Sequence, residues 1–425
     1  MCFMFYLSCL QITNPIFFCP FPLQNTSSIT TFPPFPVLLK SFANIGRSSN
    51  LIMATTKKIT DAFKSHPVHI PVHKNLDFDS FQELPDSYAW IQPATFPSLA
   101  DTDSDFDTVP LIDLSLSNVA HHVANACSTW GAFQVINHGI STSLLDRLES
   151  AANSLFSLPL HHKLKAARSP DGVTGYGLVR ISSFFPKRMW SEGFTIVGSP
   201  LDHFRQLWPN DYTEYCDTMR EYEREMKSLC GRLIWMALGE LGITREDMKW
   251  AGPNGDFQAS HSVTQFNSYP ICPDPDRAMG LGVHTDTSLL TVVYQNNTRG
   301  LQVLREGKRW VTVEPVPSGL VVHVGDLLHI LTNGLYPSVL HQAVVNRTRK
   351  RLSVAYVFGP PESAEISPLK KLLGPTQPPL YRPVTWSEYL GTKAKHFNDA
   401  LSSVRLCAPL TSLLDINDHS SVTVG

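Results

Sequence analysis

Residues 281–294 read Leu-Gly-Val-His-Thr-Asp-Thr-Ser-Leu-Leu-Thr-Val-Val-Tyr, an apolar and β-branched run interrupted by His284 and Asp286. This composition predicts a β-strand, and on a strand these two side chains project from the same face because successive residues alternate. An imidazole and a carboxylate on one face, joined by a second imidazole, form the 2-His-1-carboxylate set that holds Fe(II) with three open positions. His-x-Asp alone is a weak signal, so the surrounding sequence decides its value.

Further Val- and Leu-rich segments follow, separated by Gly, Pro or Asn turns such as Glu306-Gly307 and Asn333-Gly334. They comprise residues 300–304, 309–313, 320–324, 327–331, 338–346 and 351–358. Many short strands at this spacing, with no helix between them, predict an antiparallel sandwich or barrel.

Helical patterns surround this β region. Upstream, strands are expected at 109–114 and 131–139, with a helix between them that carries Val119, Val123 and Cys127 at helical spacing. Two longer helices are expected at about 143–157 and 211–241, and a last one at about 386–404. The fold class is therefore mixed α and β, with a β core flanked by helices.

The chain divides into five expected parts. They are a leader (1–52), an N-terminal arm (53–106), a helical region that packs on the core (107–255), the β core (256–361), and a C-terminal helix with its tail (362–425). The leader has Lys40 and Arg47 as its only charges, and we expect it to be disordered or to precede the working start at Met53. A plastid-targeting role is the alternative, because such leaders are poor in acids.

Composition excludes several classes of function. The 425 residues carry 35 basic and 37 acidic side chains, a formal charge of −2, so nothing indicates nucleic acid or an anionic membrane as partner. The eight cysteines are scattered without a Cys-x-x-Cys pair, as is typical of a reduced intracellular protein. We expect a cytoplasmic protein, and a monomer.

The third metal ligand is expected to be His341, on a later strand of the β core. His323 and His329 are rivals, although a buried structural histidine is the better interpretation of His329. Neutral imidazoles and a carboxylate suit Fe(II), and the lack of a thiolate disfavours structural zinc.

Ten residues after His341, Arg351-Leu352-Ser353 places a guanidinium and a hydroxyl on one face of a strand. The planar guanidinium can bind a carboxylate through two hydrogen bonds, and Ser353 can add a third. A dicarboxylate such as 2-oxoglutarate, chelating iron at its other end, fits this arrangement. An internal salt bridge from Arg351 to an acidic residue is the alternative.

These motifs, with Asn267-Ser268-Tyr269-Pro270 before them and Trp130-Gly131-Ala132-Phe133 upstream, resemble the plant 2-oxoglutarate/Fe(II)-dependent dioxygenase family. Residues 84–90 and 175–194 are similar to gibberellin 3-beta-dioxygenases. The resemblance implies a double-stranded β-helix (jelly-roll) core, with Tyr269 and Asn267 helping to hold 2-oxoglutarate. Two positions depart from the family pattern: His323 stands where Asn is usual, and Gln342 where Arg is common.

The resemblance further implies hydroxylation of a C19 gibberellin, a diterpenoid, at its 3β carbon. Fe(II) is the implied metal, 2-oxoglutarate and O2 are the co-substrates, and ascorbate is the expected reductant. The expected substrate contacts lie in the aromatic and basic segment 175–194, which fits either a cover over the site or an ordinary strand pair; they are Arg180, Phe184, Phe185, Lys187, Arg188 and Trp190.

Three other functions stay open at this point. One is a sister oxygenase that acts elsewhere on the gibberellin skeleton or on a flavonoid. Another is a non-catalytic jelly-roll that binds a hormone, although a pure binder has no use for open iron positions. The third is a zinc hydrolase on the same scaffold, which would not need Arg351 to hold a dicarboxylate.

Overall fold

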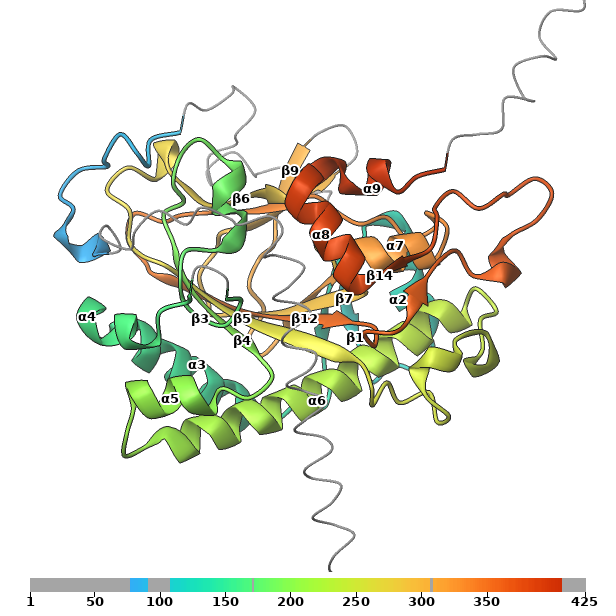
Figure 1. Ribbon diagram of the computed structural model, residues 1–425, viewed down its shortest axis with the longest axis horizontal. Helices are drawn as coiled ribbons and strands as arrows, with labels where there is room; N and C mark the ends of the chain where they lie inside the picture. Colours follow the sequence, from blue (N-terminus) through green and yellow to red (C-terminus); the bar gives the residue numbers. More distant parts are fainter. Residues whose placement is uncertain (1–76, 91–107, 170–171, 306–308, 407–425) are drawn as a thin grey trace, which may run out of the picture. The chain divides into compact units, whose positions relative to one another are not determined.

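The computed structural model describes residues 77–90, 108–169, 172–305 and 309–406. Two sheets form the core, an eight-stranded one in the order β1-β2-β10-β7-β12-β5-β4-β3 and a four-stranded one in the order β6-β11-β8-β9 (Figure 1). Apart from the parallel pair β1 and β2, the strand pairs of both sheets are antiparallel. The predicted jelly-roll core flanked by helices is confirmed.

The strands of the large sheet are β1 (Leu111–Asp113), β2 (Ala132–Ile136), β3 (Gly175–Gly177), β4 (Glu192–Val197), β5 (His261–Tyr269), β7 (Leu290–Gln295), β10 (Leu320–Val324) and β12 (Arg351–Gly359). Those of the small sheet are β6 (Met279–His284), β8 (Leu301–Arg305), β9 (Arg309–Thr312) and β11 (His341–Val344), and a separate pair is β13 (Glu365–Ile366) with β14 (Val384–Thr385). Strands β1 to β4 precede residue 256, so the large sheet continues across the boundary expected there.

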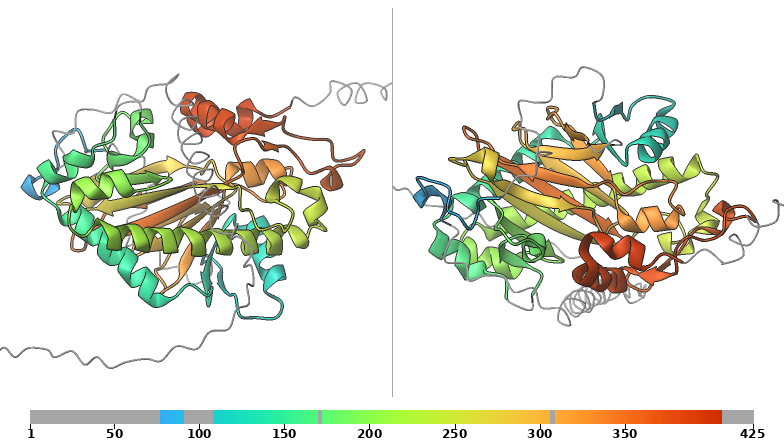
Figure 2. Two further views of the ribbon diagram at one scale, coloured as in Figure 1. Left: turned by 60° about the horizontal axis from the view of Figure 1, so that its bottom comes forward. Right: turned by 90° about the horizontal axis from the view of Figure 1, so that it is seen from above.

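The helices are α2 (Val119–Thr129), α3 (Thr142–Ser157), α4 (Leu160–Lys163), α5 (Leu201–Leu207), α6 (Tyr212–Gly239), α7 (Asp326–Leu331), α8 (Trp386–His396) and α9 (Ala400–Ser403). Helix α6 runs across one face of the large sheet (Figures 1 and 2). Its apolar residues recur every three or four positions and are buried, and the ring of Tyr222 meets that of Tyr356 on β12 edge to face at 6.1 Å. The predicted packing of this helix on the sheet is confirmed.

Residues 285–289 form a corner between β6 and β7, so the prediction of one strand over 281–294 is wrong. The backbone N–H of Asp326 donates to the Asp286 carbonyl at 2.8 Å, and that of Gly325 donates to the Leu289 carbonyl at 3.0 Å. Gly325 approaches the corner so closely that a Cβ there would collide with the Ser288 carbonyl. The corner reads Thr-Asp-Thr-Ser-Leu, and this polar run is the sequence signal for the break between the two apolar strands.

The strand expected at 327–331 is also wrong, because these residues form most of the short helix α7. Four of the five side chains in 327–331 are buried, and an apolar run this short, broken only by His329, has no periodicity that separates helix from strand. His329 on α7 has the structural role expected of it. Its Nδ1 lies 2.9 Å from the Tyr336 carbonyl and its Nε2 lies 2.8 Å from the Tyr381 hydroxyl.

The expected leader, 1–52, lies outside the described residues, as does most of the expected arm. Within 77–90, Phe78 and Tyr88 pack their rings against Trp190. The four described cysteines are buried and unpaired. Among the helices that the structure describes, none has both the length and the apolar character needed to cross a bilayer.

Candidate active site

His284 and His341 are direct cross-strand partners, one at the end of β6 and the other at the start of β11. Their rings are 4.2 Å apart, centroid to centroid. Nδ1 of His284 lies 2.8 Å from the Gly282 carbonyl, and Nδ1 of His341 lies 3.2 Å from the Val339 carbonyl. Because a carbonyl only accepts, both Nδ1 atoms carry the proton and both Nε2 atoms present a lone pair.

Asp286 completes the group from the corner after β6. Ligand atoms of His284, Asp286 and His341 all lie within 4.8 Å of one another. Burial lowers the pKa of both imidazoles, so they stay neutral and able to coordinate a metal. Burial alone would raise the pKa of the Asp286 carboxyl, but the imidazoles of His341, His323 and His284 together hold it below its ordinary value. A partly buried carboxylate between two neutral imidazoles fits Fe(II), and the described cysteines lie outside this group.

His323, the rival ligand, lies beside the three and outside the group itself. It projects from β10, fully buried, with its ring 4.2 Å from that of His341. Its Nδ1 lies 3.5 Å from Oδ2 of Asp286, the carboxylate oxygen that faces away from the other two imidazoles. The geometry therefore favours His341 as third ligand and places His323 behind the carboxylate.

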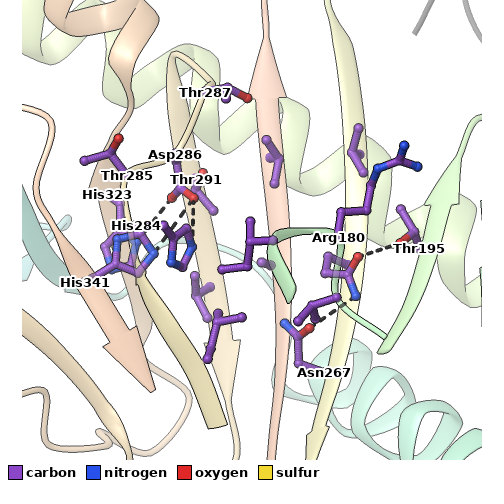
Figure 3. Close-up of a pocket in the computed structure, with 18 of the residues that line it drawn as sticks. Arg180, Thr195, Asn267, His284, Thr285, Asp286, Thr287, Thr291, His323 and His341 are labelled. Carbon is purple, nitrogen blue, oxygen red and sulfur yellow. Dashed lines mark hydrogen bonds and ion pairs between the residues drawn. The ribbon is translucent and has the colours of Figure 1, made fainter. Parts of the chain in front are cut away.

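A cavity of about 270 Å³ opens beside this group and is lined by both sheets. Its floor follows the two-residue period of a strand, because alternate residues of β12 and β5 face it in register. The four cross-strand pairs are Arg351 with Tyr269, Ser353 with Asn267, Ala355 with Gln265, and Val357 with Val263. Figure 3 shows His284, Asp286, His323 and His341 at one side of this cavity, with Arg180, Thr195 and Asn267 at the other.

Arg351 is buried, yet no carboxylate within the described part of the chain lies in ion-pair reach of it. Its Nη2 donates to the Gln295 side chain at 2.9 Å, and its guanidinium lies 4.9 Å from the centre of the Tyr269 ring. Burial lowers the pKa of this guanidinium. The internal salt bridge considered for Arg351 is absent among these residues, and a buried cation facing a cavity can receive an anionic ligand.

Comparison with known proteins agrees with this geometry. Residues 260–360 match the 2OG-Fe(II) oxygenase superfamily, and residues 109–213 match the N-terminal region named for a non-haem dioxygenase in morphine synthesis. Gibberellin 3-beta-dioxygenase 1 of Pisum sativum is 58% identical over 373 residues, 86% of this chain and 99% of the relative. Gibberellin 3-beta-dioxygenase 2 of Arabidopsis thaliana is 56% identical over 347 residues, 82% of this chain and 99% of the relative.

The chain belongs to the gibberellin 3-beta-dioxygenase family. It is an Fe(II)- and 2-oxoglutarate-dependent dioxygenase. Among solved structures, the crystal structure of JOX2 in complex with 2OG, Fe and JA matches with a TM-score of 0.67 and 28% identity, covering 80% of this chain and 99% of that one. The structure of a dioxygenase for auxin oxidation from rice matches at 0.59 and 25% identity, covering 70% and 100%.

In this member of the gibberellin 3-beta-dioxygenase family, two of the six expected substrate contacts line the cavity and four do not. Phe185, one of the four, packs its ring against those of Trp90 and Phe397. Arg180 and Phe184 line the cavity from the segment between β3 and β4. Residues 175–194 therefore form both a strand pair and a wall of the cavity. Trp190 is a core residue whose Nε1 donates to the Ile271 carbonyl. Lys187 donates to the Asp86 carbonyl, and Arg188 lies over the Tyr88 ring. These three side chains pack against the arm segment 77–90, which the sequence did not indicate as a neighbour.

The sequence interpretation missed the wall that the C-terminal helix supplies in this dioxygenase. Trp386, Leu390, Lys393 and Phe397 line the cavity from α8 and the residue that follows it. The ring of Phe397 stacks on that of Phe184 at 4.4 Å, joining this wall to the β3–β4 segment. The helix expected at about 386–404 gave one available signal of this wall, a lysine among apolar residues on its inner face.

A polar strip in the cavity of this dioxygenase was also missed. Arg168 donates to Thr195 at 2.9 Å, Thr195 donates to Gln265 at 2.6 Å, and Gln265 donates to Asn267 at 3.2 Å.

The other departure from the family pattern, Gln342, lies on the face of β11 opposite His341 and donates to Gln302 at 2.9 Å. That substitution therefore leaves the metal group untouched.

Proposed function

We propose that this protein hydroxylates a C19 gibberellin at its 3β carbon, with Fe(II), 2-oxoglutarate and O2. The observation that carries the proposal is the placement of Arg351, a buried cation without a carboxylate partner in the described chain, in the same cavity as the His284, Asp286 and His341 group. High identity to gibberellin 3-beta-dioxygenases from two plants supports the choice of substrate.

Each residue has a separate role in this proposal. His284, Asp286 and His341 hold Fe(II), which when bound supplies the chemistry that couples oxidative decarboxylation of 2-oxoglutarate to hydroxylation of a C–H bond. Arg351 and Ser353 bind the distal carboxylate of 2-oxoglutarate. The Tyr269 ring lies against the guanidinium of Arg351 and positions it. Asn267 is the cross-strand partner of Ser353. The overall reaction turns 2-oxoglutarate, O2 and substrate into succinate, CO2 and the alcohol.

The substrate end of the cavity suits a carboxylated diterpenoid. Phe184, Phe397 and Leu390 offer apolar surface for the fused rings, and they exclude water from the reacting carbon. Arg180 lines the same space, and burial lowers the pKa of its guanidinium to about 10, so it remains charged at neutral pH. We propose that Arg180 faces the gibberellin carboxylate.

The test is an assay of purified protein with Fe(II), ascorbate, 2-oxoglutarate and a series of gibberellin precursors. Succinate is measured together with the position of the new hydroxyl, which mass spectrometry and NMR assign. We expect substrate-dependent succinate in equal amount to a 3β-hydroxylated product. A hydroxyl elsewhere, or turnover of a flavonoid instead, would favour the sister oxygenase, and succinate that no gibberellin stimulates would refute the proposal. Omitting ascorbate tests its expected role as reductant.

We further propose that the protein acts as a monomer in the cytoplasm. The near-neutral charge balance, and a cavity whose metal group and Arg351 come from one chain, support this. Light scattering on the purified chain and imaging of a full-length fluorescent fusion test the two statements; a dimer mass or plastid fluorescence would contradict them.

A further inference from the structure

Thr285 stands between two of the metal-binding side chains and is tied to the C-terminal helix. Its hydroxyl accepts a hydrogen bond from Nζ of Lys393 on α8 at 2.5 Å. The same hydroxyl donates to Oδ2 of Asp326 at 3.1 Å. Since Thr285 adjoins both His284 and Asp286, any movement of its side chain acts on the backbone that carries these ligands.

Asp326 closes the network from the other side of the corner. Its carboxylate is fully buried and accepts hydrogen bonds from Lys393 at 3.0 Å and from the Tyr389 hydroxyl at 2.8 Å. Its backbone N–H donates to the Asp286 carbonyl at 2.8 Å. Asp326 therefore holds the corner through its main chain and α8 through its side chain.

Helix α8 is also a wall of the substrate cavity. Leu390, Lys393 and Phe397 line the cavity, and Phe397 stacks on Phe184 across it. Phe397 has φ +47°, a conformation that a bulky residue rarely adopts unless its surroundings impose it. One helix thus contacts both the space for the substrate and the loop of the metal ligands.

A buried Lys–Asp pair is a costly way to attach a helix, because apolar residues of similar size would avoid the desolvation of two charges. Lys393 and Asp326 are both buried, and the third member of the network, Thr285, adjoins two metal-binding residues. These contacts place the pair where it can control the position of Asp286 as well as attach α8.

We propose that Lys393 is a positioning residue, which holds the loop of Asp286 in its metal-binding position only while α8 is docked across the cavity. The proposal rests on the metal site of the proposed function. It adds that docking of α8 across the cavity and binding of the metal are coupled through Thr285 and Asp326. Each event therefore favours the other.

The test uses Co(II) as an oxygen-stable probe for the metal site, titrated into the metal-free full chain and followed by calorimetry and visible absorption. Lys393→Met removes the charge and keeps the length of the side chain. Thr285→Val removes the hydroxyl, keeps the shape, and leaves the Lys393–Asp326 pair intact, so it reports on the coupling even where Lys393→Met fails to fold. Glu388→Gln is the matched control, because Glu388 also lies on α8 and its substitution weakens an exposed pair with Arg382, which precedes the helix.

We expect Co(II) affinity to fall about 10- to 100-fold in Lys393→Met and about 10-fold in Thr285→Val, and to stay unchanged in Glu388→Gln. Co(II) with 2-oxoglutarate should slow hydrogen exchange of the α8 amides in the wild type and fail to do so in Thr285→Val. The proposal would be overturned if Thr285→Val bound Co(II) as tightly as the wild type and if Co(II) with 2-oxoglutarate slowed hydrogen exchange of its α8 amides as much as in the wild type. If wild type and Asp286→Ala bind Co(II) equally, the metal site of the proposed function fails instead.

Discussion

Nε2 of His341 lies 3.8 Å from Oδ1 of Asp286, and Nε2 of His284 lies at the same distance from that oxygen. The carboxylate is thus the shared corner of the group. We predict that Asp286→Asn, which keeps the shape and removes the charge, lowers Co(II) affinity by at least about 100-fold, because a neutral amide binds a divalent cation much more weakly than a carboxylate does. Calorimetry of the metal-free protein measures this. Asp217→Asn, at an exposed carboxylate on α6, is the matched control and should bind as wild type.

His323 faces the other oxygen of the same carboxylate. We predict that His323→Asn lowers Co(II) affinity by about 10-fold or less, since it removes at most one interaction with a charged group. His341→Asn should lower affinity far more, because it removes a ligand. Comparable losses in the two variants would make His323 a ligand and contradict the assignment of His341.

Arg351→Met should raise the KM for 2-oxoglutarate by roughly 10- to 100-fold, the loss expected for one or two charge-assisted hydrogen bonds. The variant should fold, since no buried carboxylate among the described residues loses its partner. Steady-state kinetics at saturating gibberellin measures the change, and Co(II) titration should show an intact metal site. Unaltered affinity for 2-oxoglutarate would remove Arg351 from the co-substrate site.

Phe397→Ala should raise the KM for the gibberellin about 3- to 10-fold through loss of the stacked pair with Phe184. The KM for 2-oxoglutarate should not change, because neither ring belongs to the Arg351 end of the floor. Phe397→Leu restores apolar surface without the ring, so its KM for the gibberellin should lie between those of the wild type and Phe397→Ala. A parallel rise in both KM values would mean that the wall supports the whole cavity.

Stability should fall as pH drops from about 7 to 5. Burial lowers the pKa of His329, so below the ordinary value of about 6.5 the unfolded chain takes up a proton that the folded chain refuses. The contribution is complete above that value and is lost as pH falls toward the folded pKa. We predict a shallower loss in His329→Gln, measured by urea unfolding at three pH values. Wild-type and variant slopes that coincide would exclude His329 as a source.

The strand period explains why much of the site could be predicted. Arg351 and Ser353 are two residues apart, and on a strand that spacing alone puts both on one face. The antiparallel sandwich or barrel followed from the same kind of pattern, because short strands broken by turns leave little room for helices, and the family resemblance narrowed it to a jelly-roll. His341 could be chosen over His329 because the latter sits in an apolar run that indicates a buried residue.

The remainder depends on contacts between distant segments, which local pattern does not record. Asp286 was placed on the strand of His284, yet it lies in the corner after that strand, and the corner is held by Asp326, forty residues later in the chain. Trp190 was expected in the cavity but meets Phe78 and Tyr88. The α8 wall was missed because an amphipathic helix has an apolar inner face whether it covers a core or a cavity.

Strand β12 presents residues to this cavity at regular intervals, which makes it suitable for redesign. Arg351, Ser353, Ala355 and Val357 face it in turn, and each step of two residues advances about 7 Å along the floor. Enlarging Ala355 or Val357 therefore reshapes the space for the substrate, each at a different distance from Arg351 and Ser353. A single inserted residue upstream in this strand would turn all later members of the series to the opposite face together, so substitutions, not insertions, are the changes by which new specificities can be reached.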